Sequence, residues 1–188
     1  MLSSTLADIR HWARARLSQR RLRHTEGVAA VCCELAGRYG ADVAEAEAVA
    51  WLHDSLRDLS DAALLKTASE FGIFIDDISR VRPMLLHGPV AAAAASRDLD
   101  LPGHMRRAVA WHTTGCRTMD VLAKCLFVAD AVEPGRGYMG VEGLRTAAYS
   151  DLETAVLAVL DQSIRFVVAR GELLHCRTVE ARNALLLR

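Results

Sequence analysis

The 188-residue sequence has no excess of charge of either sign, because 23 lysines and arginines balance 23 aspartates and glutamates. Proteins that hold nucleic acid through a general basic surface carry a large positive excess. We therefore do not expect nucleic acid as the main partner. A few local arginines could still bind a small anion, so the balance leaves nucleotides open as partners.

The sequence also lacks paired cysteine motifs. Its five cysteines are odd in number and scattered, with no Cys-x-x-Cys: Cys32, Cys33, Cys116, Cys125 and Cys176. Such spacing excludes a zinc knuckle and a secreted disulfide framework. We expect reduced thiols in a cytoplasmic protein. Cys116 follows closely after a candidate ligand, His112, but we interpret it as an ordinary loop cysteine.

Long apolar runs are missing as well. Residues 1–8 lack the basic start and apolar stretch of a signal peptide. The longest apolar run covers residues 89–95, far short of the roughly 18 residues that a membrane-spanning helix needs. We therefore expect no membrane association.

Alternation of apolar and polar residues with a period of two never persists, whereas helical spacing recurs throughout. We expect helices over about residues 6–17, 23–39, 43–56, 60–71, from 87 up to 101, 102–112, 119–132, 151–169 and 179–187. Residues 73–83 should be irregular, and Pro134-Gly135 marks a break. The prediction is an all-α bundle forming one domain over residues 1–188.

Residues 50–58 hold the most informative pattern, an apolar helical segment that reaches an adjacent His53-Asp54 pair. Imidazole and carboxylate groups bind divalent zinc, iron and manganese. Adjacent helical residues point about 100° apart, so the pair needs ligands from other helices. Taken alone, a His-Asp dipeptide is more often an ordinary helix end than part of a metal site.

Four further polar residues stand where an apolar residue would continue a core stripe: His24, His87, His112 and Asp130. Asp130 is flanked by Phe127, Val128, Ala129, Ala131 and Val132. A carboxylate in such a helix is costly to bury unless it is paired or bound to metal. The six groups together therefore favour a metal site between helices.

This series resembles the HD-domain phosphohydrolase superfamily, whose members are all-α metal enzymes. The segments 21–28, 85–90, 111–115, 128–136, 174–178 and 181–183 resemble one bacterial branch, the YqeK-type symmetrical bis(5′-nucleosyl)-tetraphosphatases. The resemblance implies a metal-binding core over about residues 20–135, followed by C-terminal helices over about 150–188.

The resemblance further implies two divalent or trivalent metal ions, of which iron is the first expectation and manganese or another divalent ion an alternative. One ion would be held by His24, His53, Asp54 and Asp130. Asp54 would bridge to a second ion held by His87 and His112. His53 and Asp54 would be catalytic together with a metal-bridging water.

Four more positions are expected to contact the substrate. Arg57 and Arg136 are suited to bidentate contacts with phosphate oxygens, although family members commonly carry lysine where this chain has Arg57. Thr113 and Glu133 resemble substrate-pocket positions that would contact phosphate and ribose or base, respectively. For the charged residues, a surface ion pair is the alternative.

The expected function is symmetrical hydrolysis of diadenosine tetraphosphate to two ADP. The alternatives are a general HD-type nucleotidase or phosphodiesterase and a non-catalytic nucleotide-binding adaptor. His11, His104 and His175 are interpreted as surface or helix-end histidines. A homodimer is compatible with the apolar end of the last helix, residues 184–187.

Overall fold

The structure is a computed structural model that describes residues 4–187, and none of these residues forms a strand. The helices are α1 (Leu6–Arg14), α2 (Gln19–Tyr39), α3 (Val43–Leu52), α4 (Asp61–Glu70), α5 (Asp77–Val81), the 3₁₀-helix η1 (Pro83–Leu86), α6 (His87–Leu99), α7 (Gly103–Trp111), α8 (Val121–Val132), α9 (Val141–Ser150), α10 (Leu152–Ala169) and α11 (Cys176–Leu186). The predicted all-α fold is confirmed. Residues 1–3, which belong to the segment in which we predicted no signal-peptide pattern, and residue 188 lie outside the described residues.

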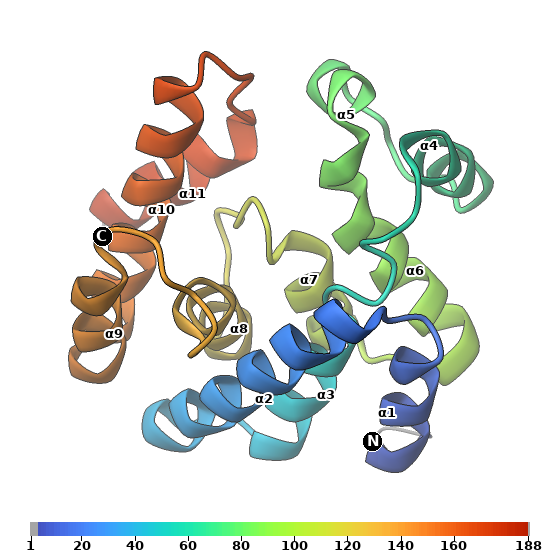
Figure 1. The fold of residues 1–188 in the computed structure, drawn as a ribbon, viewed down its shortest axis with the longest axis horizontal. Coiled ribbons are helices and arrows are strands. Elements are labelled where there is room, and N and C mark those ends of the chain that lie inside the picture. Colours follow the sequence, from blue (N-terminus) through green and yellow to red (C-terminus); the bar gives the residue numbers. More distant parts are fainter. Residues whose placement is uncertain (1–3, 188) are drawn as a thin grey trace.

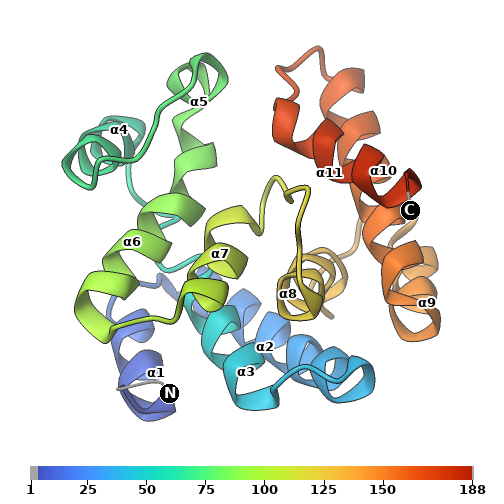
Figure 2. The same cartoon turned by 180° about the vertical axis from the view of Figure 1, so that it is seen from behind.

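Helix α8 lies in the middle of the fold (Figures 1 and 2). It packs against α2, α3 and α7 on one side and against α9 and α10 on the other. Helices α4, α5 and α6 lie on the opposite flank from α9, α10 and α11. The predicted metal ligands therefore belong to the central layer and to its contact with α6.

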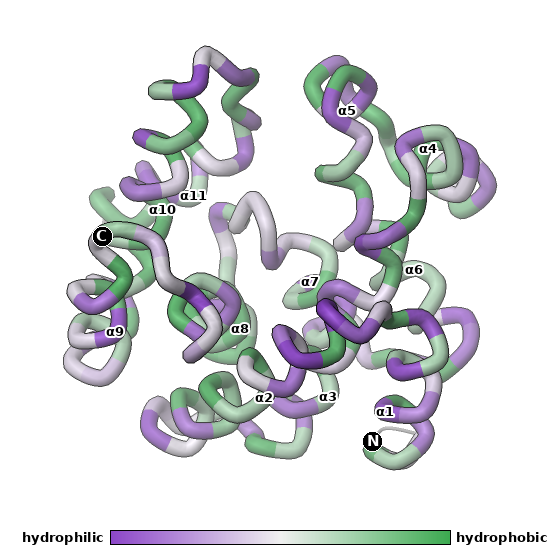
Figure 3. Tube along the Cα trace, viewed as in Figure 1, coloured by the Kyte–Doolittle hydropathy of each residue, from purple (hydrophilic) through white to green (hydrophobic). Residues whose placement is uncertain are grey.

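Burial explains the position of α8. Most of its side chains are buried, and the hydropathy colouring shows a largely apolar helix (Figure 3). Its one lysine, Lys124, is 5% exposed and pairs with Glu153 on α10, as a buried charge requires. The main core extends without interruption from Ile9 in α1 to Ala181 in α11, and a smaller apolar cluster lies beneath α4.

The predicted helix over residues 43–56 is wrong at its end, because α3 stops at Leu52. The Ser55 hydroxyl donates a hydrogen bond to the Leu52 carbonyl (2.8 Å), and the His53 ring contacts the Ala50 carbonyl (2.6 Å). Side chains of this kind satisfy the carbonyl groups that the end of a helix leaves free. Asp54 consequently lies in a turn beyond the helix.

The prediction also missed α9, a short helix that follows Gly140 (φ +91°), has no side-chain cap and contains Gly143. Only three of its residues are buried, so its apolar signal is weak. Within the supposedly irregular stretch 73–83, α5 and the start of η1 are helical. Helix α11 begins three residues early because the His175 ring accepts a hydrogen bond from the Arg177 amide (3.1 Å).

In the described part of the chain, no helix combines the length and the apolar character that crossing a bilayer requires.

Candidate metal centre

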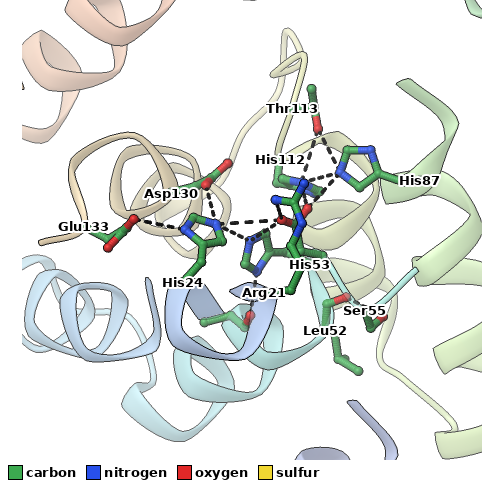
Figure 4. A network of polar contacts seen from close by, with 12 residues as sticks. Arg21, His24, Leu52, His53, Ser55, His87, His112, Thr113, Asp130 and Glu133 are labelled. Carbon is green, nitrogen blue, oxygen red and sulfur yellow. Dashed lines mark hydrogen bonds and ion pairs between the residues drawn. The ribbon is translucent and has the colours of Figure 1, made fainter. Parts of the chain in front are cut away.

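The six predicted ligands converge on one place between five helices (Figure 4). His24 comes from the second turn of α2, and Asp130 from the last turn of α8. The other four follow or begin helices: His53 and Asp54 after α3, His87 at the start of α6, and His112 after α7. Residues far apart in sequence thus share a single cluster.

Three of the histidines are held in the same way. Each is the residue directly after a helix: His53 follows α3, His87 follows η1 and also begins α6, and His112 follows α7. Each ring places its Nδ1 atom against the backbone carbonyl three residues earlier, at 2.6 Å from Ala50, 2.5 Å from Met84 and 2.8 Å from Val109, respectively. Histidine side chains commonly bind the free carbonyls of a last helical turn. A carbonyl only accepts, so Nδ1 carries the proton and Nε2 keeps its lone pair.

The fourth histidine, His24, lies inside α2, where the helix uses its own carbonyls. Its Nδ1 atom lies 3.0 Å from the Glu133 carboxylate, which follows α8. The sequence suggested that each imidazole needs such an acceptor but did not identify the groups. The structure supplies three backbone carbonyls and one carboxylate.

All four Nε2 atoms face the Asp54 carboxylate, which divides them into two pairs. Its Oδ2 atom lies 3.8 Å from Nε2 of both His24 and His53. Its Oδ1 atom lies 3.1 Å from Nε2 of His87 and 3.8 Å from Nε2 of His112. Asp130 Oδ1 lies 3.1 Å from Nε2 of His24. Each Asp54 oxygen therefore faces one pair of imidazoles, and Asp130 adds a second carboxylate to the first pair.

The donor atoms fit divalent metal ions. The Nε2 atoms of His87 and His112 lie 3.0 Å apart, and those of His53 and His24 lie 3.4 Å apart. With the protons on Nδ1, each of these contacts sets two lone pairs against each other, and a cation between them turns the repulsion into attraction. The ligand atoms of His24, His53 and Asp130, and those of His53, Asp54 and His112, lie within 4.8 Å of one another. Imidazole and carboxylate donors suit zinc, iron and manganese.

The electrostatics keep the carboxylates ionised and His53 neutral. Burial acts to raise the pKa of Asp54, but the imidazole rings of His53, His112 and His87 around its carboxylate hold that pKa well below its usual range. The pKa of Asp130 is likewise lowered against the effect of burial, mainly by the His24 ring beside it. Burial lowers the pKa of His53 to about 4, although Asp54 opposes the shift. The two carboxylates and His53 are thus in the protonation states that bind metal, whereas the pKa values of His24 and His112 are raised, against the effect of burial, by the carboxylates beside them.

Sequence reasoning missed Arg21 as a member of the cluster. Its Nη1 atom donates to Asp54 Oδ2 at 2.8 Å, and its Nε atom lies 3.4 Å from Asp58. Arg21 precedes His24 by three residues, which places the two on one face of α2. That spacing was the signal that could have identified it.

The two arginines predicted to contact phosphate differ in their surroundings. Arg136 bonds Asp130 through the side-chain oxygen (2.6 Å) and the backbone carbonyl (2.8 Å). Among residues 4–187, Arg57 makes only a weak hydrogen-bond contact, with the Met84 sulfur (3.8 Å). Burial, followed by the nearby charge of Arg21, lowers the pKa of Arg57. The charge of Arg57 is therefore the less compensated of the two.

Thr113 lies at the edge of the cluster, with its hydroxyl 3.2 Å from Nε2 of His112 and 3.4 Å from Nε2 of His87. Glu133, predicted to contact ribose or base, is 5% exposed and faces His24. The other histidines lie elsewhere: His11 is exposed, His104 pairs with Glu45 and His175 begins α11. All five cysteines are free.

Comparison with known proteins supports the family resemblance. The HD domain family matches residues 21–135. A protein from Halalkalibacterium halodurans named symmetrical bis(5′-nucleosyl)-tetraphosphatase is 33% identical to this chain, over 91% of each of the two chains. A protein of the same name from Bacillus subtilis is 30% identical, over 83% of this chain and 84% of its own length. A crystal structure from Clostridium acetobutylicum, described as a predicted HD superfamily hydrolase involved in NAD metabolism, superposes with a TM-score of 0.93, 32% identity and 98% coverage of both chains.

Proposed function

This chain belongs to the HD domain family, and from that premise we propose that it is a metal-dependent hydrolase that cuts diadenosine tetraphosphate symmetrically into two ADP. The names of the relatives from Halalkalibacterium and Bacillus support this substrate. The observation that carries the proposal is the division of four imidazole Nε2 atoms between the two oxygens of Asp54.

We assign two ion positions from this division. His24, His53, Asp130 and Asp54 Oδ2 form the first, and His87, His112 and Asp54 Oδ1 form the second. Iron is the proposed metal, and manganese also suits these donors. Two ions held by these residues would lower the pKa of a water molecule and would supply positive charge against the attacked phosphate. Asp54 is the residue on which both positions depend.

The side chains around the cluster then bind and orient the substrate. Water attacks an inner phosphorus in line and the central anhydride bond breaks. The other half leaves as one ADP, the attacked half keeps the water oxygen and becomes the second ADP, and the proton released from water passes to the solvent. The fork of Arg57 is suited to the phosphate oxygens, because its charge has no carboxylate bonded to it in the cluster. Arg136 and Thr113 remain predicted phosphate contacts. ADP is a stable anion, so its departure requires little proton donation.

The five free cysteines and the nucleotide substrate are consistent with our proposal of a cytoplasmic enzyme. A homodimer remains a prediction. Leu186 and Leu187 at the end of α11 are 54% and 79% exposed, and a second copy of the chain could pack against this apolar surface.

Product analysis tests the proposal. Protein purified without oxygen is incubated with ferrous or manganous ion and diadenosine tetraphosphate, and the nucleotides are separated by chromatography. ADP as the sole product supports symmetrical cleavage, whereas AMP together with ATP contradicts it. Cleavage of many unrelated nucleotides favours the general nucleotidase. Stoichiometric binding without turnover favours the adaptor.

Matched variants locate the activity. His87→Ala removes a predicted ligand, and His104→Ala removes a histidine that pairs with Glu45 outside the cluster. We expect loss of turnover only in the first variant. NAD belongs among the tested substrates, because the Clostridium relative is described as involved in NAD metabolism.

A further inference from the structure

His24 is the ligand that cannot be held by its own helix. The other three histidines end helices and bond the carbonyl three residues before them. His24 is the sixth residue of α2 (Gln19–Tyr39), where the carbonyls accept the helical amides. A ring at such a position needs an acceptor from another element if its Nδ1 proton is to be fixed.

Glu133 is placed to be that acceptor. Its Oε1 atom lies 3.0 Å from His24 Nδ1, and its Oε2 atom accepts the Gly135 amide at 2.5 Å. Only 5% of the residue is exposed. Both oxygens are therefore occupied inside the protein, and little of the carboxylate is available to a substrate.

Two glycines make room for this carboxylate. A Cβ atom at Gly27, on α2, would lie 2.8 Å from Glu133 Oε2, and one at Gly135 would lie 2.9 Å from the same atom. Real Cβ atoms essentially never show contacts below 3.0 Å. The close approach of Glu133 to His24 thus depends on two positions without side chains, one on each of the segments that the contact joins.

We propose that Glu133 is a positioning residue for His24, and that the sequence-based assignment to ribose or base is replaced by this role. Its carboxylate fixes the proton on Nδ1, turns Nε2 toward Asp54 and Asp130, and increases the electron density that the ring offers an ion. The inference rests on the proposed function only through the metal centre.

The arrangement makes the two ion positions unequal. The first position has the Asp130 carboxylate and one oxygen of Asp54 around it, and the negative charge of Glu133 lies behind His24. Arg136 lies 2.6 Å from Asp130 and 3.7 Å from Glu133, and its positive charge offsets part of this negative charge. The second has one carboxylate oxygen and rings backed by neutral carbonyls. Loss of the Glu133 charge should therefore weaken the first position selectively.

The test measures manganese binding without substrate. In the full chain carrying His87→Ala, which disables the second position, free manganous ion is followed by electron paramagnetic resonance with and without Glu133→Gln. Removal of such supporting groups typically weakens metal binding about 10- to 100-fold, and we expect this loss. Glu70→Gln is the control, because the Glu70 side chain is 60% exposed on α4 and lies 3.8 Å from Lys66, outside the cluster, and it should change nothing.

Two results would overturn the inference. One is a manganese affinity of the double variant within about twofold of the His87→Ala parent. The other is a Glu133→Gln variant with His87 intact that retains two ions on dialysis but has a raised KM for the nucleotide, which would indicate a substrate contact. If His87→Ala does not fold, Glu133→Gln alone should lower the number of ions retained on dialysis from two to one. If manganese binding requires Glu133 but the wild-type protein hydrolyses no nucleotide, the proposed function is refuted and the inference is supported.

Discussion

Whether Gly27→Ala raises or lowers the free energy of unfolding should depend on Glu133. An alanine inside a helix is ordinarily more stable than a glycine by about 0.5–1 kcal/mol. Here the new Cβ would lie 2.8 Å from Glu133 Oε2, so the carboxylate must move away from His24 or the Gly135 amide. Losing a hydrogen bond to a charged group costs about 1.5–3 kcal/mol. We therefore expect a net loss of about 1–2 kcal/mol in the free energy of unfolding.

Two comparisons isolate this effect. At Gly37, an exposed position on the same helix, the nearest atom to a new Cβ is a Val43 methyl at 3.8 Å, so Gly37→Ala should stabilise the protein by the ordinary helical amount. In a Glu133→Ala background the obstruction is gone, and Gly27→Ala should then stabilise as well. The two changes at Gly27 and Glu133 should thus be strongly non-additive, as expected for residues in contact.

Thermal unfolding of the metal-free protein provides the measurement. For a chain of this length 1 kcal/mol corresponds to about 2–4 °C in Tm, so the Gly27 and Gly37 variants should move in opposite directions. Manganese affinity should fall in the Gly27 variant alone. Equal stabilisation by both alanines in the wild-type background would refute the reasoning about the Glu133 site.

Three further predictions follow from the cluster. Asp54→Ala should release both ions and abolish turnover, since each Asp54 oxygen faces one pair of histidines; metal analysis that still finds two ions would contradict the assignment. Thr113→Val should keep the metal content but lower kcat/KM about tenfold, the equivalent of one hydrogen bond; an unchanged rate would remove Thr113 from the substrate site. Because burial lowers the pKa of His53 to about 4, below its unfolded value near 6.5, its stabilising contribution of about 3 kcal/mol is complete above pH 6.5 and is lost as the pH falls toward 4. Denaturant titrations of the metal-free protein between these pH values should show a smaller pH dependence in His53→Gln than in the wild type.

Much of the fold was predictable because helical periodicity is a local property. The spacing of apolar residues indicated most helices within a few positions, including α8, whose buried face is long and uninterrupted. The errors fall where local signals are weak or where side chains compete with the backbone. Helix α9 buries only three residues, and α3 ends early because His53 and Ser55 bond its last carbonyls.

The sequence by itself determined the chemistry of the donors. His24, His53, Asp54, His87, His112 and Asp130 were identifiable because polar residues interrupt apolar stripes, and because their order resembles one family. The sequence around each of these residues does not show which of their side-chain atoms lie in contact. That arrangement depends on how five helices pack.

Only the tertiary structure decided the division of the four Nε2 atoms between the two oxygens of Asp54. It also decided that Arg21 joins the cluster and that Glu133 stands behind His24, 109 residues away in the sequence. The physical reason is the same in each case. The identity of a side chain sets which bonds it can form, but a distance of about 3 Å between remote residues is set by the packing of the helices that carry them.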